Sequence, residues 1–428
     1  MDEHPVQLIV EDDLRRNRLT VFFRLILAIP HLIWVFLWSI AIVFVAIATW
    51  VATLVRGRPP SSLHGWACAY VRYLSHLNAY LWLVANPYPG FVGEEGEYPV
   101  DVTLPPPAPQ SRWKTLLRVV LAIPAILLSL AIGGRFSFGG SFGRAGGTNG
   151  RGYSSSFSGF SGGLATVSSV LGWFASVARG RMPKGLRDAG AYSVGYSAQV
   201  LAYLLFVTDR YPNADPTALL EGVERPPLHP VHLVGDAHDL RRSRVLVFFR
   251  LPLAIPHVVW LILWSVAAIV VGVINWFVTL FAGTPSAALH RFLSRYVRYT
   301  LHVYAFLYLT ANPFPGFAGV RGSYPLDVEL PGPGRQNRWI TGFRIVLAVP
   351  ALLVNSVLGW GLTIAAVLTW FAALVTGSAP WGLRNLSAYA LRYSAQVNAY
   401  VYLLTDAYPH ASPLEGAPDA QLSFDEDA

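Results

Sequence analysis

The chain has 428 residues, of which 54% are hydrophobic and only 13% are charged, and its mean hydropathy is +0.43. Because a soluble domain carries about 25% charged residues, this composition excludes an ordinary soluble protein and indicates an integral membrane protein. The formal net charge of +8 comes almost wholly from arginines, which flank apolar stretches. This placement is typical of the cytoplasmic loops of membrane proteins and argues against binding to nucleic acid.

Three further features of the sequence bear on how the protein is built: its uncharged stretches, its N-terminus and its single cysteine. Stretches without a charged residue run over 25–55, 251–290 and 345–383, and each exceeds the roughly 20 residues that a spanning helix needs. The first residues, MDEHPVQLIV, lack a basic segment followed by an apolar one, so we expect no cleavable signal peptide. The single cysteine, Cys68, allows no intramolecular disulfide and no paired-cysteine metal site.

The same series of elements occurs four times along the chain. Each unit begins with alternating apolar and polar residues, which predict a short β-strand: PVQLIV, YPVDVTL, PVHLV and YPLDVEL. An arginine then precedes a proline, a long apolar stretch follows, and a G-x-x-P turn leads into a third helical segment that ends at Tyr-Pro or Phe-Pro. The predicted units are 1–97, 98–222, 223–323 and 324–412.

Two segments lie outside this repeat. The second unit carries a Gly/Ser-rich insertion at 134–162, to which we assign no secondary structure. The acidic tail at 413–428 is expected to be disordered.

The repeated pattern R…LAIPH…W…G-x-x-P-x-x-L…RY…AY…YP resembles an uncharacterised bacterial membrane family, domain of unknown function 4389. The resemblance extends over all four units and leaves out the insertion and the tail. Units 2 and 4 depart from it, because Ala125 and Ala351 replace the histidine of the AIPH motif. The resemblance implies a bacterial membrane protein and implies no activity.

The long apolar stretch of each unit can be arranged in two ways. As one helix, residues 19–55 would measure about 55 Å, nearly twice the ~30 Å hydrocarbon core. Arginines lie at both ends of the stretch, so both ends are expected on the cytoplasmic side and the chain should cross an even number of times. The polar insertion cannot lie in hydrocarbon and would extend a hairpin tip. We therefore expect helical hairpins, with one long tilted helix per unit as the alternative.

These elements predict an all-α polytopic membrane protein with about eight spans and both termini in the cytoplasm. Each of its four pseudo-repeated units would be a helical hairpin plus an interfacial third helix, preceded by a short β-strand. The repeated arginines would lie at the inner membrane boundary, in a structural role or in contact with lipid headgroups: Arg24, Arg118, Arg250 and Arg344. The repeated prolines would kink the helices: Pro30, Pro124, Pro256 and Pro350.

Histidines and two aspartates are further candidate site residues. The odd units supply two equivalent histidine pairs, His31 with His76 and His257 with His302. Four histidines could hold a metal ion or a haem if they converged. The even units carry alanine or glutamine at these positions, which fits hydrogen bonding better than ligation, so we expect no metal site. For Asp209 and Asp406 we expect a salt bridge to a juxtamembrane arginine.

The residues suggest no enzyme. No nucleophile, acid–base set or cofactor motif occurs in a suitable context, and the acidic residues lie outside the long apolar stretches, which argues against proton coupling. We expect a non-enzymatic protein of the bacterial inner membrane, without a cofactor, that scaffolds lipids or partners. Its partners would be the bilayer, including anionic headgroups, and a protein on the cytoplasmic face. A transporter or channel along the pseudo-symmetry axis, and a membrane enzyme or metal-binding protein, are the alternatives.

Overall fold

The computed structural model describes residues 4–133, 162–235 and 239–416. The helices in these ranges are α1 (Arg18–Phe22), α2 (Arg24–Leu27), α3 (Ile29–Arg56), α4 (Ser61–Leu81), α5 (Arg112–Gly133), α6 (Leu164–Arg179), α7 (Lys184–Leu204), α8 (Arg244–Phe248), α9 (Arg250–Ala282), α10 (Ala287–Leu307), α11 (Arg338–Gly342), α12 (Arg344–Thr376) and α13 (Trp381–Val401). The strands are β1 (Leu8–Val10), β2 (Val100–Val102), β3 (Leu220–Glu221), β4 (His232–Val234) and β5 (Asp327–Glu329).

The apolar stretches of units 1, 3 and 4 form single helices instead of the predicted hairpins. In unit 1, α2 and α3 follow each other directly, and α9 and α12 run unbroken from the arginine to the G-x-x-P turn. The hairpin prediction is therefore wrong for these units, and the count of eight spans falls with it. A continuous helix satisfies its own backbone hydrogen bonds along the whole stretch, and in α12 it continues even through Gly359 and Gly361.

In the described residues, four helices are long and apolar enough to cross a membrane: Arg24–Arg56, Arg112–Gly133, Arg250–Ala282 and Arg344–Thr376. In unit 2 the apolar stretch is divided between α5 and α6, and α12 packs against both of them. The predicted insertion between α5 and α6 lies outside the described residues except for residue 162. Of the tail predicted to be disordered at 413–428, residues 417–428 also lie outside the described residues. The prediction is wrong for the start of this tail, because Leu414 is 7% exposed and the Pro413 carbonyl accepts from Arg392 at 3.1 Å. We call α2–α3, α5–α6, α9 and α12 the long helices.

A glycine with left-handed backbone ends each long helix. Gly57, Gly180, Gly283 and Gly377 have φ values of 72°, 70°, 75° and 75°, and each N–H returns to the carbonyl four residues earlier. Glycine adopts this conformation without a Cβ clash, and the proline that follows it cannot continue the helix. This glycine makes the predicted turn in all four units, but only units 1, 2 and 4 have the G-x-x-P motif, since Pro285 of unit 3 follows Gly283 by two residues instead of three.

The repeated prolines lie near the starts of the long helices. In unit 1 the helix is interrupted at Ala28, and Pro30 occupies the first turn of α3. Pro124, Pro256 and Pro350 lie inside α5, α9 and α12, which continue through them. The predicted kink thus coincides with a helix break in unit 1, whereas the other three helices continue through their prolines without a break.

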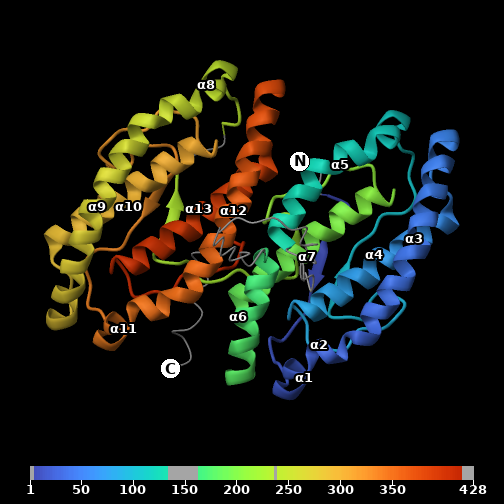
Figure 1. Ribbon diagram of the computed structural model, residues 1–428, viewed down its shortest axis with the longest axis horizontal. Coiled ribbons are helices and arrows are strands. Elements are labelled where there is room, and N and C mark those ends of the chain that lie inside the picture. The colour runs from blue at the N-terminus through green and yellow to red at the C-terminus, as the bar shows by residue number, and fades with distance from the viewer. Residues whose placement is uncertain (1–3, 134–161, 236–238, 417–428) are drawn as a thin grey trace, which may run out of the picture.

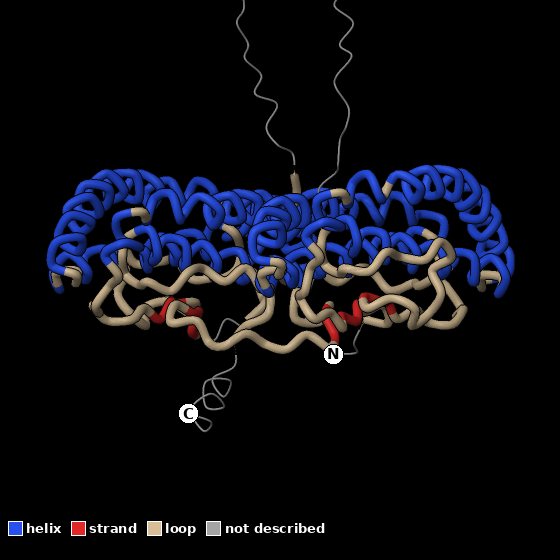
Figure 2. The backbone as a smooth tube through the Cα atoms, turned by 90° about the horizontal axis from the view of Figure 1, so that it is seen from below, coloured by secondary structure: helices blue, strands red, loops and turns tan. Residues whose placement is uncertain are grey.

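The helices form a slab, and the strands lie on one side of it. The helices lie in the plane of the view down the shortest axis (Figure 1), and the edge-on view places the strands in two separate groups below them (Figure 2). The third helices, α4, α7, α10 and α13, contact both the long helices and the strands. They are the central layer of the molecule, and many of their side chains are buried against the long helices and the strands.

All four predicted strands are present, and they pair across the units. β1 pairs antiparallel with β2, and β4 pairs antiparallel with β5. The strand that precedes an odd unit therefore joins the strand that precedes the next unit. β3, which pairs parallel with β1, was not predicted from the sequence. We call the side of the slab that carries these strands and their loops the strand face.

The outer side of the long helices is apolar and exposed. On α9, Ala254, His257 and Leu261 are buried, whereas Ile255 and Ile262 are 60% and 59% exposed. Along α9, about one side chain in three or four thus contacts the rest of the molecule. Most of the other side chains around the helix are apolar and exposed. We call the exposed apolar side chains of α3, α5, α9 and α12 the apolar face. A surface of this extent is typical of a face that contacts a membrane or a partner.

Candidate functional site

The repeated arginines are buried and bind the C-terminal ends of the third helices. Arg24 is 3% exposed and donates to the backbone carbonyls of Tyr80, Ala85 (3.2 Å) and Asn86 (3.4 Å). Its guanidinium carbon lies 4.3 Å from the centre of the Tyr80 ring. The Tyr80 carbonyl also accepts the Leu83 N–H at 3.2 Å, whereas Ala85 and Asn86 lie just beyond the end of α4. All three carbonyls lie at the negative end of the α4 dipole, so a cation bonded there stabilises the helix end.

The other three repeated arginines make equivalent contacts. Their carbonyl partners are Tyr203 and Thr208 for Arg118, Ala311 and Asn312 for Arg250, and Thr405 for Arg344. The rings beneath them are Tyr203, Phe306 and Tyr400. Each arginine therefore joins the start of a long helix to the end of the third helix of its own unit, which is the structural role of the two that the sequence suggested.

A second polar side chain caps each third helix at a residue with left-handed backbone. These residues are Leu83, Phe206, Leu309 and Leu403, with φ values of 61°, 62°, 61° and 60°. Their carbonyl oxygens accept from Arg16, Gln110, Arg242 and Gln336 respectively. Sequence reasoning missed this set, although each member precedes a repeated arginine by the same eight residues.

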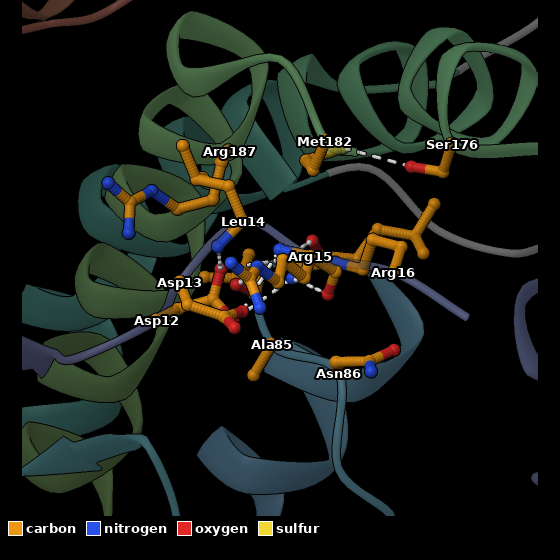
Figure 3. Close-up of polar contacts among 12 residues, drawn as sticks. Asp12, Asp13, Leu14, Arg15, Arg16, Ala85, Asn86, Ser176, Met182 and Arg187 are labelled. Atoms are coloured by element: carbon orange, nitrogen blue, oxygen red, sulfur yellow. Dashed lines mark hydrogen bonds and ion pairs between the residues drawn. The ribbon is translucent and has the colours of Figure 1, made fainter. Parts of the chain in front are cut away.

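Acidic partners differ between odd and even units. The predicted salt bridges are present: Arg118 with Asp209 at 2.8 Å, and Arg344 with Asp406. In unit 1 the aspartate is Asp12, which pairs with the second capping residue, Arg16, at 2.7 Å (Figure 3). These ion pairs join groups inside one unit and reduce the cost of burying the guanidinium charge.

The four histidines occupy two kinds of environment and do not converge. His31 Nδ1 lies 2.8 Å from the Tyr73 hydroxyl, and its ring stacks on Phe91 at 4.2 Å. His76 instead faces the strands, with Nε2 3.2 Å from the Asp101 carboxylate. His257 and His302 repeat these contacts with Tyr299, Phe317 and Asp327. Among the described residues, no three His, Cys, Asp or Glu side chains are grouped as a metal site would require.

The glutamines that replace His76 and His302 in the even units are hydrogen-bonded, as their chemistry predicts. Gln199 donates to the Val6 carbonyl at 2.7 Å and accepts the Asn213 N–H at 2.9 Å. Gln396 does the same with Val231 and His410. This position of the third helix therefore fixes the strand face to the central layer in all four units.

Asp101 and Asp327 are the ionised centres of this attachment in the odd units. Burial would raise the pKa of Asp101, but hydrogen bonds from His76 and from the Gly96 and Val102 N–H groups, with the charge of Arg72, lower its pKa to about 2. The Arg72 Nε lies 3.0 Å from the carboxylate. The same arrangement lowers the pKa of Asp327. Neither carboxylate is therefore suited to proton transfer near neutral pH.

Exposed arginines lie at both ends of a long helix. Arg15 and Arg18 precede α3 on the N-terminal side, and Arg56 and Arg58 lie at its C-terminal end, all of them exposed. Arg112, also exposed, donates to the Val55 carbonyl at the same end. The molecule thus has an apolar face bordered by cations and a strand face held by buried ionic networks, and these two surfaces are its candidate functional sites.

A family model for the domain of unknown function DUF4389 matches residues 18–92, 156–214, 244–318 and 338–412. Comparison with curated proteins and with solved structures found no match. Each matched segment covers a long helix or part of one, the G-x-x-P turn and the third helix. The chain therefore belongs to the DUF4389 family and carries four tandem copies of its domain.

Proposed function

We propose that this protein is a non-enzymatic scaffold of the bacterial cytoplasmic membrane that lies along one leaflet. Its long helices would run parallel to the membrane plane with the apolar face among the acyl chains. The strand face would be turned to the cytoplasm, where it would hold a protein partner. The observation that carries this proposal is that the strands lie on one side of the helical slab (Figure 2) and pack against the third helices, whereas the exposed apolar side chains belong to the long helices. The proposal involves no cofactor and no nucleic acid.

The length of the long helices supports an in-plane orientation. α9 and α12 each have 33 residues and therefore measure about 50 Å. To cross a hydrocarbon core of about 30 Å they would need a tilt near 50°, whereas spanning helices tilt by about 0–40°.

The charges at the helix ends support the same orientation. Exposed arginines at both ends of α3 are expected on the cytoplasmic side of the membrane. Both ends of α3 can lie on that side if the chain between them crosses the membrane an even number of times, and this includes no crossing at all. A helix that enters one leaflet sideways meets this condition without a hairpin.

Labelling of single cysteines tests this proposal. In a Cys68→Ser background, one cysteine is placed at Asn17, Ile40 or Ser61, which lie before, within and after α3 and are exposed. In intact bacterial cells, a membrane-impermeant maleimide should label none of the three. After permeabilisation, it should label positions 17 and 61 and leave position 40 protected by acyl chains.

Other labelling patterns would contradict the in-plane orientation. Labelling of position 17 or position 61 alone in intact cells would show that α3 spans the membrane. Labelling of position 40 in intact cells would show that the middle of α3 is open to the outside of the cell, which would also contradict the in-plane orientation. Recovery of the protein in the soluble fraction after an alkaline wash would overturn the membrane assignment itself.

A further inference from the structure

We infer that unit 3 binds an anionic phospholipid in a groove between α9, α10 and the loop after α10. The acyl chains would lie along the apolar wall of α9, and the phosphate would bind Arg291 and Arg295. This inference rests on the proposed membrane location and adds a ligand class and a site to it.

The groove is large and continuous with the apolar face. Its volume is about 670 Å³, and its apolar lining comes from Trp260, Leu263, Trp264, Phe292 and Phe317. Trp260 and Leu263 are 44% and 58% exposed and belong to the apolar face of α9. The Trp260 Nε1–H donates to the Phe317 carbonyl at 3.1 Å, which fixes the loop against the helix. An acyl chain that covers α9 can therefore enter the groove without crossing a polar barrier.

Two arginines on the wall of this groove have no acidic partner among the described residues. Arg291 and Arg295 are one turn apart on α10, so their side chains lie on the same face. Both are exposed, and the hydrogen bond of the Arg291 side chain goes to the Ala287 carbonyl at 3.3 Å. Two guanidinium groups beside an apolar groove are complementary to a phosphate that carries acyl chains.

Unit 1 supplies an internal comparison. Its equivalent residues include Trp34, Trp38 and Phe91, and the Trp34 Nε1–H donates to the Phe91 carbonyl at 2.8 Å, as Trp260 does to Phe317. The positions of Arg291 and Arg295 are, however, occupied by Gly65 and Ala69. The same wall and loop are therefore present twice, and the cationic pair is present in unit 3 alone of these two odd units. This difference assigns the charge selectivity to unit 3.

Binding of lipids to the purified full-length protein in neutral detergent tests the inference. Native mass spectrometry would measure binding of phosphatidylglycerol and phosphatidylcholine to the natural protein and to the R291A/R295A variant. The natural protein should prefer phosphatidylglycerol, and the variant should bind it about tenfold more weakly with phosphatidylcholine unchanged. The variant R225A/R335A loses the same charge from two exposed arginines outside the groove lining and should keep the preference.

A gain-of-binding variant separates a specific site from general electrostatic attraction. The variant G65R/A69R should bind a second phosphatidylglycerol, and a Cβ at Gly65 meets no atom within 4 Å, so the site has room for the change. Equal loss of phosphatidylglycerol in R291A/R295A and R225A/R335A would overturn the inference. If inorganic phosphate stabilised the natural protein as much as phosphatidylglycerol does, the site would be one for free anions. This outcome would also overturn the inference. These outcomes concern lipid selectivity, whereas cysteine labelling decides the membrane orientation independently.

Discussion

Leu83 shows how a single residue links two elements of a unit. A leucine with left-handed backbone costs roughly 1–2 kcal/mol, which is why helices usually end at glycine. Here the Leu83 side chain is buried against Val21 and Met182, so glycine would lose that packing. Arg16 and Arg24 bind the carbonyls around Leu83, which holds the strained turn in place. The arginines that the sequence suggested for the membrane boundary thus serve the interior of the unit.

The role of these arginines could be foreseen only in part. Their repetition and their distance from the proline are visible in the sequence, and so is the aspartate of the even units. The carbonyls that Arg24 binds lie 56 to 62 residues later in the chain. Local patterns carry no information on such distant contacts, so a headgroup contact and a helix cap could not be told apart before the fold was known.

The ionised carboxylates of the strand face should make the free energy of unfolding depend on pH in the acid range. The pKa of Asp101 is held near 2, below its ordinary value of 3.8, so its ionisation favours the folded state above about pH 4. This stabilisation, of order 2 kcal/mol, is lost as the pH falls from 4 toward 2. At pH 6, the variant D101N/D327N should be less stable than the natural protein. On acidification, it should lose less of its remaining stability than the natural protein does.

Thermal unfolding in detergent between pH 2 and pH 7 measures this dependence. Asp13, an exposed aspartate that accepts the Arg15 N–H at 2.9 Å, provides the control variant D13N. An acid dependence in D101N/D327N equal to that of the natural protein would show that other carboxylates carry the effect.

At the scale of elements, the sequence predicted local features well, and it predicted poorly the features that depend on contacts between distant segments. The strands, the G-x-x-P turns and the third helices follow from alternation, glycine and helical periodicity, which act over a few residues. The apolar stretches of units 1, 3 and 4, which form single helices, were misread as hairpins because hydropathy records only that a segment avoids water. It does not record whether the segment crosses a bilayer, lies along it or turns back within it. The burial of the third helices was equally hidden, since their polar residues bond to strands that are distant in sequence.

The loop after each odd third helix depends on a glycine for its position. Gly93 has φ of 70°, and a Cβ there would lie 2.6 Å from the Tyr73 N and 2.7 Å from the Ala69 carbonyl oxygen. The loop must therefore move away from α4, which would separate Phe91 from His31. We expect G93A to lower the free energy of unfolding by about 3 kcal/mol or more, from backbone strain and lost packing.

Gly96 supplies the matched control for this prediction. It has a similar φ of 76°, but a Cβ there would meet no atom within 4 Å. G96A should cost only the conformational penalty of about 1 kcal/mol. Thermal unfolding of both variants in the same detergent compares them. Equal losses would mean that close packing of the loop on α4 contributes nothing.

At the scale of the whole molecule, the repeat explains the slab. Each unit buries a narrow stripe of its long helix on a third helix, and pairs of units are joined by their strands. The two halves then meet at the centre, where α12 packs on α5 and α6. The sequence revealed the repeat and its units, but the lateral arrangement depends on contacts between halves, which no single unit encodes. The proposed orientation would place a bilayer on the apolar face and the cytoplasm on the strand face of this arrangement.

A buried aspartate tests how firmly the two halves are joined. Asp215 of the first half is 4% exposed and accepts from the Trp381 Nε1–H at 3.1 Å and the Asn385 amide at 2.8 Å in the second half. D215A leaves both donors without this acceptor, and we expect a loss of about 2–4 kcal/mol of stability. Thr217 Oγ1 also donates to Asp215, at 2.8 Å, but within the same loop. T217V should therefore cost about 1 kcal/mol or less, because the contact between the halves survives. Chemical unfolding in detergent, followed by tryptophan fluorescence, compares the two variants, and a loss in T217V as large as that in D215A would assign the effect to the loop instead of the junction.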